Sequence, residues 1–448
     1  MANKNSLDKL QQLIIGATSQ TIDCHELVSD GNLTDKFAGV NLTSADLSLS
    51  DLDDVNLSGS ILQGAYLLCA NLKRTNFSNS NLSGANLSGA IMWFANLCNA
   101  DLSGADLRGA SLRGAKLSNA KLQGANLWRS DITEGELSQT NLTDANLNLA
   151  NLKNANLTGA DLSHAQLNEA NLKDSNLAGA DLSHAQLNDV NLKDSNLAGA
   201  NLFSINLVGG KLTRANLSDA NFEGANLEGA NLSDANLNNA KLRGVNLNHV
   251  NFRGVKINYA TELDRKWYIV WDIVNHGAYG RNLSGVNLEN ADLKGANIGA
   301  ANLINANLTN ANLRYANLSD TNLTNTKLIN ANLTDINLIK ANLYNANLQG
   351  ANLTNTLLFN ATLRGALLNE AKLVKTQLSD TELSDAKLIK ANLMNANLKN
   401  ARLLGADLRE INLEGAELDG SVFGNNLGIS EEMKQDLIQR GAIFKDEY

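Results

Sequence analysis

Apolar residues return at every fifth position along most of this chain, beginning at Leu42 and Leu47 and continuing to Phe252 and Ile257. Two positions before each of them there is usually a small or β-branched residue, and the position between the two is usually Asn or Asp. The repeating unit therefore reads A-(N/D)-L-x-x. About 44 such units run from Leu42 to Ile257.

A spacing of five residues fits neither of the regular elements. On an α-helix it advances by about 500°, so successive leucines would drift by about 140° and spread around the whole surface. In a plain strand five is odd, so alternate leucines would fall on opposite faces. The pattern predicts instead that each unit forms one side of a square coil, with the leucine and the small residue both pointing inward.

An internal duplication gives the number of sides in a coil. Residues 161–180 recur as residues 181–200, and the two copies differ only where Glu169 and Ala170 are replaced by Asp189 and Val190. Twenty residues, or four units, therefore behave as one module, as expected if one full coil is the piece that is inserted.

The A-(N/D)-L-x-x run resembles the pentapeptide-repeat family over roughly residues 37–423, apart from one interruption. This resemblance implies an all-β solenoid, a right-handed quadrilateral β-helix. The helical ends and the central helix argued below also resemble pentapeptide proteins common in cyanobacteria. The resemblance implies a fold rather than an activity, because the functions of most family members are unassigned.

The repeat is interrupted at residues 262–280 and resumes at Leu283 for about 29 further units. Leu283 follows Ile257 by 26 residues, one more than a multiple of five. Inside the interruption, apolar residues follow the spacing of one helix face, and Gly277 is a candidate C-cap. We expect a short helix whose apolar face packs on the solenoid or, less favoured, on a partner. Its face comprises Trp267, Val270, Trp271 and Val274, widened by Tyr268, Ile269 and Ile273.

Both ends of the chain predict covering helices. Leu7, Leu10, Leu13 and Ile14 form a helical stripe near the start, and Ser430 is placed to cap a helix that ends near Gln439. Such helices would cover the open ends of the coils, which otherwise expose backbone donors. The expected architecture is two stacked β-helix segments with short helical caps and one helical insert. Its parts are an N-terminal cap at 1–36, a first β-helix at 37–261, the insert at 262–280, a second β-helix at 281–423 and a C-terminal cap at 424–448.

Composition adds one structural argument and several exclusions. The chain contains no proline, as expected if most backbone N–H groups are needed by neighbouring coils. Glycine is frequent at the last position of the unit, as at Gly84 and Gly109, where a corner favours a positive φ.

The net charge of −9 disfavours a general affinity for nucleic acid or anionic membranes. Three scattered cysteines and the lack of a leader pattern at the start predict a cytoplasmic protein.

No catalytic motif emerges from the sequence, so we expect no enzyme activity and no cofactor. His164 and His184 stand at the same outward position of adjacent coils. A two-histidine metal site there would lack further ligands nearby, so we read the pair as a by-product of the duplication and predict no metal.

Two outward features are candidate partner-binding surfaces. Ile91, Trp93 and Phe94 form an apolar cluster, although covering loop or cap residues are an equal alternative. A column of residues at twenty-residue intervals is rich in lysine and arginine and could receive an acidic partner. A solvated face of mixed charge is the favoured alternative there, because Asp174 and Asp194 lie beside the column. Its basic members are Lys73, Arg113, Lys153, Lys173, Lys193 and Arg253.

Two functions are compared. The first is a scaffold that presents rigid flat faces to a protein partner of unknown identity, with DNA disfavoured as a partner and no membrane expected. The second is implied by the resemblance alone, since some pentapeptide-repeat proteins imitate DNA and inhibit type II topoisomerases. Duplex DNA carries one charge per roughly 1.7 Å, so mimicry would need on the order of 50 negative charges. Residues 161–200 carry a net −4 and residues 201–260 a net +2, so the scaffold is favoured.

Overall fold

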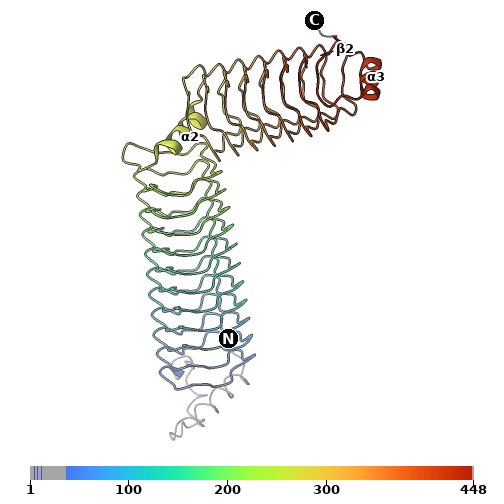
Figure 1. Ribbon diagram of the computed structural model, residues 1–448. Helices are drawn as coiled ribbons and strands as arrows, with labels where there is room; N and C mark the ends of the chain where they lie inside the picture. Colours follow the sequence, from blue (N-terminus) through green and yellow to red (C-terminus); the bar gives the residue numbers. More distant parts are fainter. Residues whose placement is uncertain (1–4, 6–7, 9–11, 13–36, 446–448) are drawn as a thin grey trace. The chain divides into compact units, whose positions relative to one another are not determined.

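The computed structural model describes residues 37–445, together with isolated positions 5, 8 and 12 (Figure 1). The predicted N-terminal cap at 1–36 therefore lies almost entirely outside the described residues. From residue 37 onward the chain winds into successive coils (Figure 1). Short elements interrupt or end the coils: helix α2 (Arg265–His276), strand β1 (Val422–Phe423), helix α3 (Glu431–Gln439) and strand β2 (Ile443–Phe444).

Each coil contains four five-residue sides. Parallel bridges join residues that are twenty apart, such as Asn41 to Ile61 and Asp46 to Tyr66, and they repeat at every fifth residue through unit after unit. The coil length predicted from the duplication is therefore present along the solenoid. Each bridge is one residue long on each coil, because the chain turns a corner before a longer strand can form.

The core consists of the residues predicted to point inward. Leucines such as Leu152 and Leu333 and the alanines that precede them, such as Ala150 and Ala331, are buried. Where threonine replaces alanine, its hydroxyl is satisfied inside the core: Thr75 donates to the carbonyl of Leu52 in the preceding coil at 2.8 Å. The threonine hydroxyl thus meets its hydrogen bond inside the core, whereas the shorter serine hydroxyls of Ser50 and Ser130 at the same position have no partner among the described residues.

One repeat unit shows where the backbone donors go. The amide of Asn196 donates to the preceding coil at 2.9 Å, and those of Leu197 and Gly199 donate to the following coil at 2.7 and 2.8 Å. The amide of Ala200 closes the corner onto the carbonyl of Leu197 at 3.1 Å. The amide of Ala198 donates to Oδ1 of Asn196 at 3.2 Å. All five N–H groups are thus engaged, four of them by backbone carbonyls, which accounts for the missing proline.

The last residue of each unit adopts a positive φ, as the glycines at this position predicted. Gly199 has φ of 69°, and many other residues share the conformation, including Asn154 at 59° and Asp194 at 61°. Positive φ at the second central residue is the mark of a type II turn. Glycine, asparagine and aspartate tolerate this conformation best, which explains their frequency there.

The described chain divides into two compact units. Unit 1 runs to Leu247 and includes Gly254–Leu263, whereas unit 2 contains Asn248–Arg253 and the residues from Asp264 onward. In unit 1 the last bridge joins Lys241 to Glu262, a separation of 21 residues instead of twenty. The extra residue lies in the turn Asn258–Thr261, where the amide of Thr261 donates to the carbonyl of Asn258 at 3.1 Å. The one-residue phase shift therefore precedes helix α2.

Helix α2 belongs to unit 2 and ends at the predicted C-cap. Gly277 has φ of 74°, and its amide donates to the carbonyl of Ile273. The buried face of the helix is formed by Trp267, Val270 and Ile273. The regular turns begin again directly afterwards, because the amide of Arg281 already closes a turn onto Ala278 at 3.1 Å.

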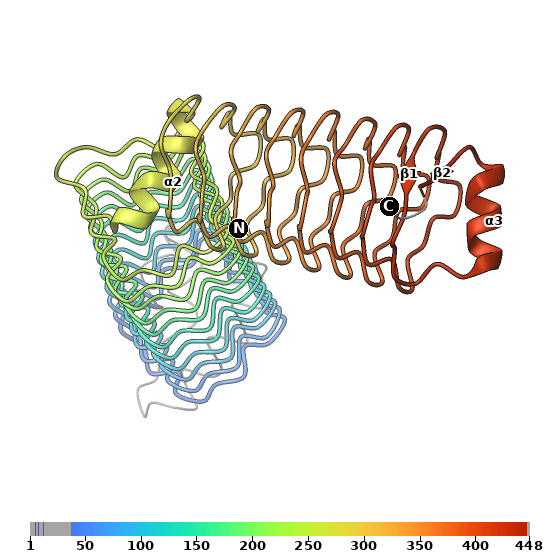
Figure 2. The ribbon, with the colours of Figure 1, turned by 45° about the horizontal axis from the view of Figure 1, so that its top comes forward.

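The last coil of unit 2 is covered by the C-terminal segment (Figure 2). Ser430 is the N-cap of α3, as predicted, and its hydroxyl accepts from the amide of Met433. After the helix, β2 pairs in parallel with β1. Arg440 donates from Nη2 to the carbonyls of Leu413 and Ala416 at 2.7 and 2.6 Å. These contacts occupy backbone acceptors at the end of the coil.

Candidate protein-interaction surface

Most of the outward residues singled out in the sequence lie on one side of unit 1. Numbering the four sides of a coil from Asn41, the third side begins at Asp51 and recurs every twenty residues. It carries both the apolar cluster and the basic column, because Trp93 stands in the same twenty-residue column as Lys73 and Arg113. Its candidate members are Lys73, Ile91, Trp93, Phe94, Arg113, Lys153, Lys173 and Lys193.

The apolar cluster is accessible. Trp93 is 40% exposed and Phe94 is 56% exposed, while Ile91 is half-buried. The indole is held in place, because its Nε1 donates to the hydroxyl of Ser111 at 2.6 Å. No described loop or cap residue covers the two rings, so the covering alternative receives no support from this part of the chain.

A lysine from the preceding coil joins the cluster. Nζ of Lys73 lies 4.6 Å from the ring centroid of Trp93, within the range of a cation–π interaction. In the following coil Gly114 leaves space for the ring of Phe94, since a Cβ added to Gly114 would lie 2.6 Å from two ring carbons. The three coils therefore fit together as one patch, which we call the aromatic patch: Lys73, Ile91, Trp93, Phe94 and Gly114.

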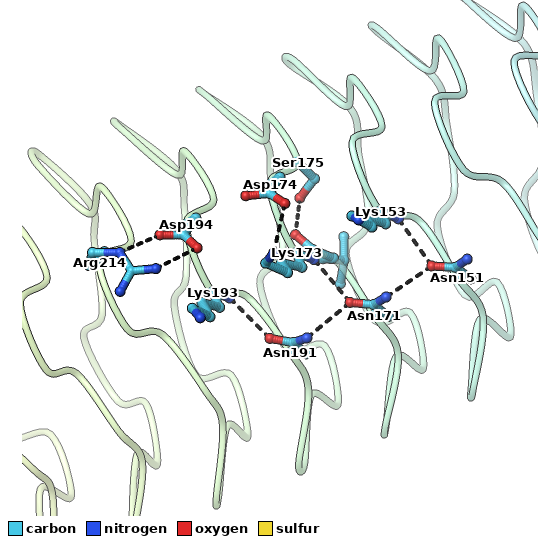
Figure 3. Close-up of polar contacts among 11 residues, drawn as sticks. Asn151, Lys153, Asn171, Lys173, Asp174, Ser175, Asn191, Lys193, Asp194 and Arg214 are labelled. Carbon is cyan, nitrogen blue, oxygen red and sulfur yellow. Dashed lines mark hydrogen bonds and ion pairs between the residues drawn. The ribbon is translucent and has the colours of Figure 1, made fainter.

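Farther along the third side, Lys153, Lys173 and Lys193 project from successive coils (Figure 3). The backbone amide of each donates to Oδ1 of the asparagine two residues before it, at 3.4, 3.2 and 3.3 Å. Those asparagines are linked to one another: Asn171 donates to Asn151 and Asn191 donates to Asn171, each at 3.0 Å. This amide ladder fixes the positions from which the lysine side chains extend.

The basic column is partly neutralised by neighbouring acids. Lys173 forms an ion pair with Asp174 at 3.2 Å, and Arg113 approaches Glu134 at 3.6 Å. Lys153 and Lys193 form no ion pair within residues 37–445. The column therefore resembles the favoured alternative, a mixed-charge face, more than a continuous cationic stripe.

Arg214 and Asp194 close the same face with a two-point ion pair. Nε and Nη2 of Arg214 donate to the two carboxylate oxygens of Asp194 at 2.7 and 2.9 Å (Figure 3). These hydrogen bonds lower the pKa of Asp194, so its carboxylate stays ionised under mildly acidic conditions.

The two tryptophans of the insert belong to unit 2 and serve its packing. Trp267 is only 6% exposed, and its ring centroid lies 6.5 Å from that of Phe252. Trp271 is half-buried between Tyr268 and His276, with ring centroids 5.5 and 5.1 Å away. Trp267 is therefore a core residue of unit 2, which is the packing alternative favoured from the sequence.

The two histidines related by the duplication stack on each other. The rings of His164 and His184 are nearly parallel, and their centroids are 4.9 Å apart. The ring of Phe203 meets the ring of His184 edge-on. Parallel stacking does not aim two nitrogens at one point, as shared metal ligation requires. Within the described residues no group of three His, Cys, Asp or Glu side chains is suited to hold a metal ion.

No helix among residues 37–445 is long and apolar enough to cross a membrane.

A second exposed tryptophan was missed in the sequence. Trp128 lies on the second side of unit 1 and is 37% exposed, with the guanidinium of Arg129 lying 4.4 Å from its ring centroid. The twenty-residue ruler places it one column away from the aromatic patch, so the same counting that found Trp93 would have found it. The cation over the ring of Trp128 comes from the next residue in the chain, Arg129, whereas the cation over the ring of Trp93 comes from Lys73 in another coil.

Comparison with known proteins identifies a family. A family model described as pentapeptide repeats (8 copies) matches residues 36–129, 136–254 and 282–425, well over half of the chain. A search of the curated proteins found no match.

Solved structures of pentapeptide-repeat proteins are similar to parts of the chain. HetL, involved in heterocyst differentiation regulation in the cyanobacterium Nostoc sp. strain PCC 7120, is 32% identical, with 53% of this chain and 92% of HetL covered and a TM-score of 0.23. Rfr23 from the cyanobacterium Cyanothece 51142 is 38% identical over 23% of this chain and 64% of its own, with a TM-score of 0.13. The plasmid-mediated fluoroquinolone resistance protein QnrB1 is 19% identical over 40% of this chain and 85% of its own, with a TM-score of 0.24.

Proposed function

This chain belongs to the pentapeptide-repeat family, and from that premise we propose that it is a non-enzymatic scaffold that binds a protein partner through the third side of unit 1. Its solenoid is the right-handed β-helix of that family. The docking site is centred on the aromatic patch, and the lysines farther along the third side extend it. The proposal rests on one observation above all: Trp93 and Phe94 are exposed on a backbone that is hydrogen-bonded to the coils on both sides, from the amide of Arg74 to the carbonyl of Trp93 at 2.8 Å and from the amide of Phe94 to that of Arg113 at 2.9 Å.

Rigid exposed aromatics are suited to binding. Tyrosine and tryptophan side chains supply much of the energy of protein interfaces, because they bury a large area and lose little conformational freedom. Trp93 is already held by Ser111 and Lys73, so binding costs little additional ordering entropy. A partner would therefore meet a preformed surface.

The charges near the patch indicate what the partner offers. Lys73 and Arg113 flank the two aromatic rings, and Arg74 beside them forms an ion pair with Asp53 at 2.7 Å. A complementary surface would present an apolar group to the rings and carboxylates to Lys73 and Arg113. Because these charges are exposed, they would affect the rate of association and its salt dependence more than the final affinity.

The test is an affinity capture from the organism's own lysate with the double variant Trp93→Ala and Phe94→Ala. The proposal expects at least one protein, captured by wild type and confirmed as a direct binder after purification, to be lost with the double variant. Trp128→Ala is the matched control, since Trp128 has a similar exposure on a different side. An identical partner list for wild type, the double variant and the control would sink the proposal.

The alternative of a DNA mimic that inhibits a type II topoisomerase has less support. The net charge of the chain is −9, and the third side carries lysines in three successive coils. A mimic needs the opposite charge on the surface that faces the enzyme. Inhibition of gyrase supercoiling at stoichiometric protein would reverse this preference.

Two finer expectations accompany the proposal. We place the protein in the cytoplasm on the sequence argument alone. We also divide the chain into two β-helix segments, a helical insert and two helical caps, with the boundaries given from the sequence. Within that division, Glu262 pairs with Lys241 and Ala278 starts a regular turn, so helix α2 is the part of 262–280 that departs from the repeat.

A further inference from the structure

One side of the first coil of unit 2, residues 282–286, is unpaired, although the same coil accepts a hydrogen bond farther on, from the amide of His249 to the carbonyl of Asn290 at 2.7 Å. In the next coil the amides of Asn302 and Asn307 donate to the carbonyls of Arg281 and Val286, each at 2.9 Å. The equivalent amides of the first coil belong to Asn282 and Asn287, and they have no acceptor among residues 37–445.

The carbonyls on that edge are also open. In the second coil the carbonyl of Asn302 accepts from the amide of Leu283 at 2.7 Å, and that of Ile304 accepts from the amide of Gly285 at 2.8 Å. One coil earlier the corresponding acceptors are the carbonyls of Asn282 and Ser284, and no described residue donates to them. The side that begins at Asn282 therefore offers one donor and two acceptors in the pattern of a parallel bridge.

A cavity adjoins this edge. It has a volume of about 380 Å³, and all the residues that line it belong to unit 2. One wall is the N-terminal part of α2, including the apolar side chain of Ile269, and the other is the edge, including Leu283 and Val286. Its lining residues are Arg265, Lys266, Ile269 and residues 282–287.

The wall formed by α2 is positively charged. Arg265 and Lys266 stand in the first turn of the helix, which contains no acidic residue. The helix N-terminus adds a partial positive charge there. Arg265 is exposed and has no ion pair within the described chain. Lys266 lies 4.1 Å from the ring centroid of Trp267, and Glu289 offsets part of its charge. The cavity thus combines open backbone hydrogen-bonding groups, an apolar wall and the cation of Arg265, which forms no ion pair in the described chain although the N-cap residue Asp264 precedes it.

We propose that this edge binds a short extended segment of a protein partner by parallel β-addition, with an apolar side chain against Ile269 and Leu283 and an acidic side chain beside Arg265. Adding a strand to an open edge is a common mode of peptide recognition, in which backbone bonds supply affinity and side-chain pockets supply specificity. The segment is short, because each side of a coil contributes a single bridge before the corner. This site is independent of the aromatic patch on unit 1.

The first experiment measures how much the positive charge of Arg265 contributes to peptide binding. The probe is a fluorescently labelled, blocked hexapeptide, SDLDES, titrated into the full chain and followed by anisotropy, and a second peptide, SKLKKS, reverses its charge. Arg265→Glu places an acid where the helix dipole favours one, so the helix stays stable. We expect it to weaken binding of SDLDES by about fivefold or more, the effect of reversing one charge of a pair. Lys340→Glu makes the same charge change elsewhere in unit 2 and should leave binding unchanged.

The second experiment isolates the backbone donor. Asn282→Pro removes an N–H that makes no bond in the free protein, whereas Asn282→Ala removes the same side chain and keeps the N–H. The proposal expects Asn282→Pro to bind SDLDES more weakly than Asn282→Ala, and hydrogen exchange of residues 282–287 to slow when the peptide is bound to wild type.

Three outcomes would overturn the proposal. These are equal binding by the proline and alanine variants, no preference for SDLDES over SKLKKS, and no slowing of exchange at 282–287. Self-association of the chain that Arg265→Glu abolishes, without peptide binding, would assign the edge to a second copy and would equally reject a partner segment.

Discussion

Asn171 donates from its Nδ2 to Oδ1 of Asn151, one coil earlier, at 3.0 Å. Its own Oδ1 accepts the amide of Lys173 at 3.2 Å and Nδ2 of Asn191 at 3.0 Å. One side chain therefore caps a turn and also links three coils. Aspartate can perform the acceptor roles but has no donor, which explains why asparagine is so common at this position.

Asn171→Asp should therefore destabilise unit 1 by about 1 kcal/mol, because it removes the hydrogen bond to Asn151 and places a carboxylate against another acceptor. Thermal unfolding followed by circular dichroism measures the change. Asn221→Asp is the matched control, since the side chain of Asn221 accepts the amide of Glu223 but donates to no other described residue. If both variants lose the same stability, the ladder is not what favours asparagine.

Proline tolerance should differ between positions of one repeat unit. Ala198→Pro removes only the amide that donates to a side chain, and position i+1 of a type II turn suits proline. Its cost should stay below about 1 kcal/mol.

Ala200→Pro removes the amide that closes the turn and adds bulk to the core, so it should cost about 3 kcal/mol or more. The midpoints of chemical denaturation compare the two variants. Equal losses would contradict the assignment of the five donors.

Asp292 occupies a ladder position where the following coils have Asn312 and Asn332. Burial raises the pKa of its carboxyl, although hydrogen bonds from the amide of Lys294 and Nδ2 of Asn312 oppose the shift. A carboxyl whose pKa is raised on folding contributes stability at low pH and loses it as the pH rises through the folded pKa.

Asp292→Asn keeps both acceptor roles and removes the charge. We expect it to be more stable than wild type at neutral pH, by at most about 1 kcal/mol. The difference should vanish below pH of about 4, where both side chains are neutral. Melting temperatures across this pH range test the sign, and a variant that is less stable at neutral pH would contradict the role given to burial.

Trp267 anchors helix α2 in unit 2. Trp267→Ala should cost about 3 to 5 kcal/mol, the usual result of emptying a buried aromatic site. Trp271→Ala should cost clearly less, because Trp271 is only half-buried. Hydrogen exchange of residues 265–276 reports the loss locally, and similar protection in both variants would be inconsistent with Trp267 as the anchor.

Much of the fold could be predicted because the repeat makes one local rule act everywhere. Leucine every fifth residue defined the core, and the duplication defined the coil. The same twenty-residue spacing predicts that Lys73, Trp93 and Arg113 share one column.

Other features depend on side-chain geometry that the spacing does not encode. The double role of Asn171 is one example, and the space over Gly114 that receives Phe94 is another. The spacing of leucines shows that the repeat shifts by one residue across the interruption, but it does not show that the extra residue lies in the turn Asn258–Thr261. Residues near an interruption share no repeat pattern with their neighbours from which that position could be predicted. The open edge at Asn282 could be found only by comparing hydrogen bonds between coils.

The engagement of all five backbone donors in a unit such as 196–200 has a consequence for how such a chain changes length. A single inserted residue moves every following leucine out of step with the coil beneath it, unless a corner absorbs it as the turn at Asn258 does. Twenty inserted residues disturb nothing, since the new coil presents the same donors and acceptors to both neighbours. The gene can therefore grow or shrink in whole coils, and the copy at residues 181–200 is the record of one such step.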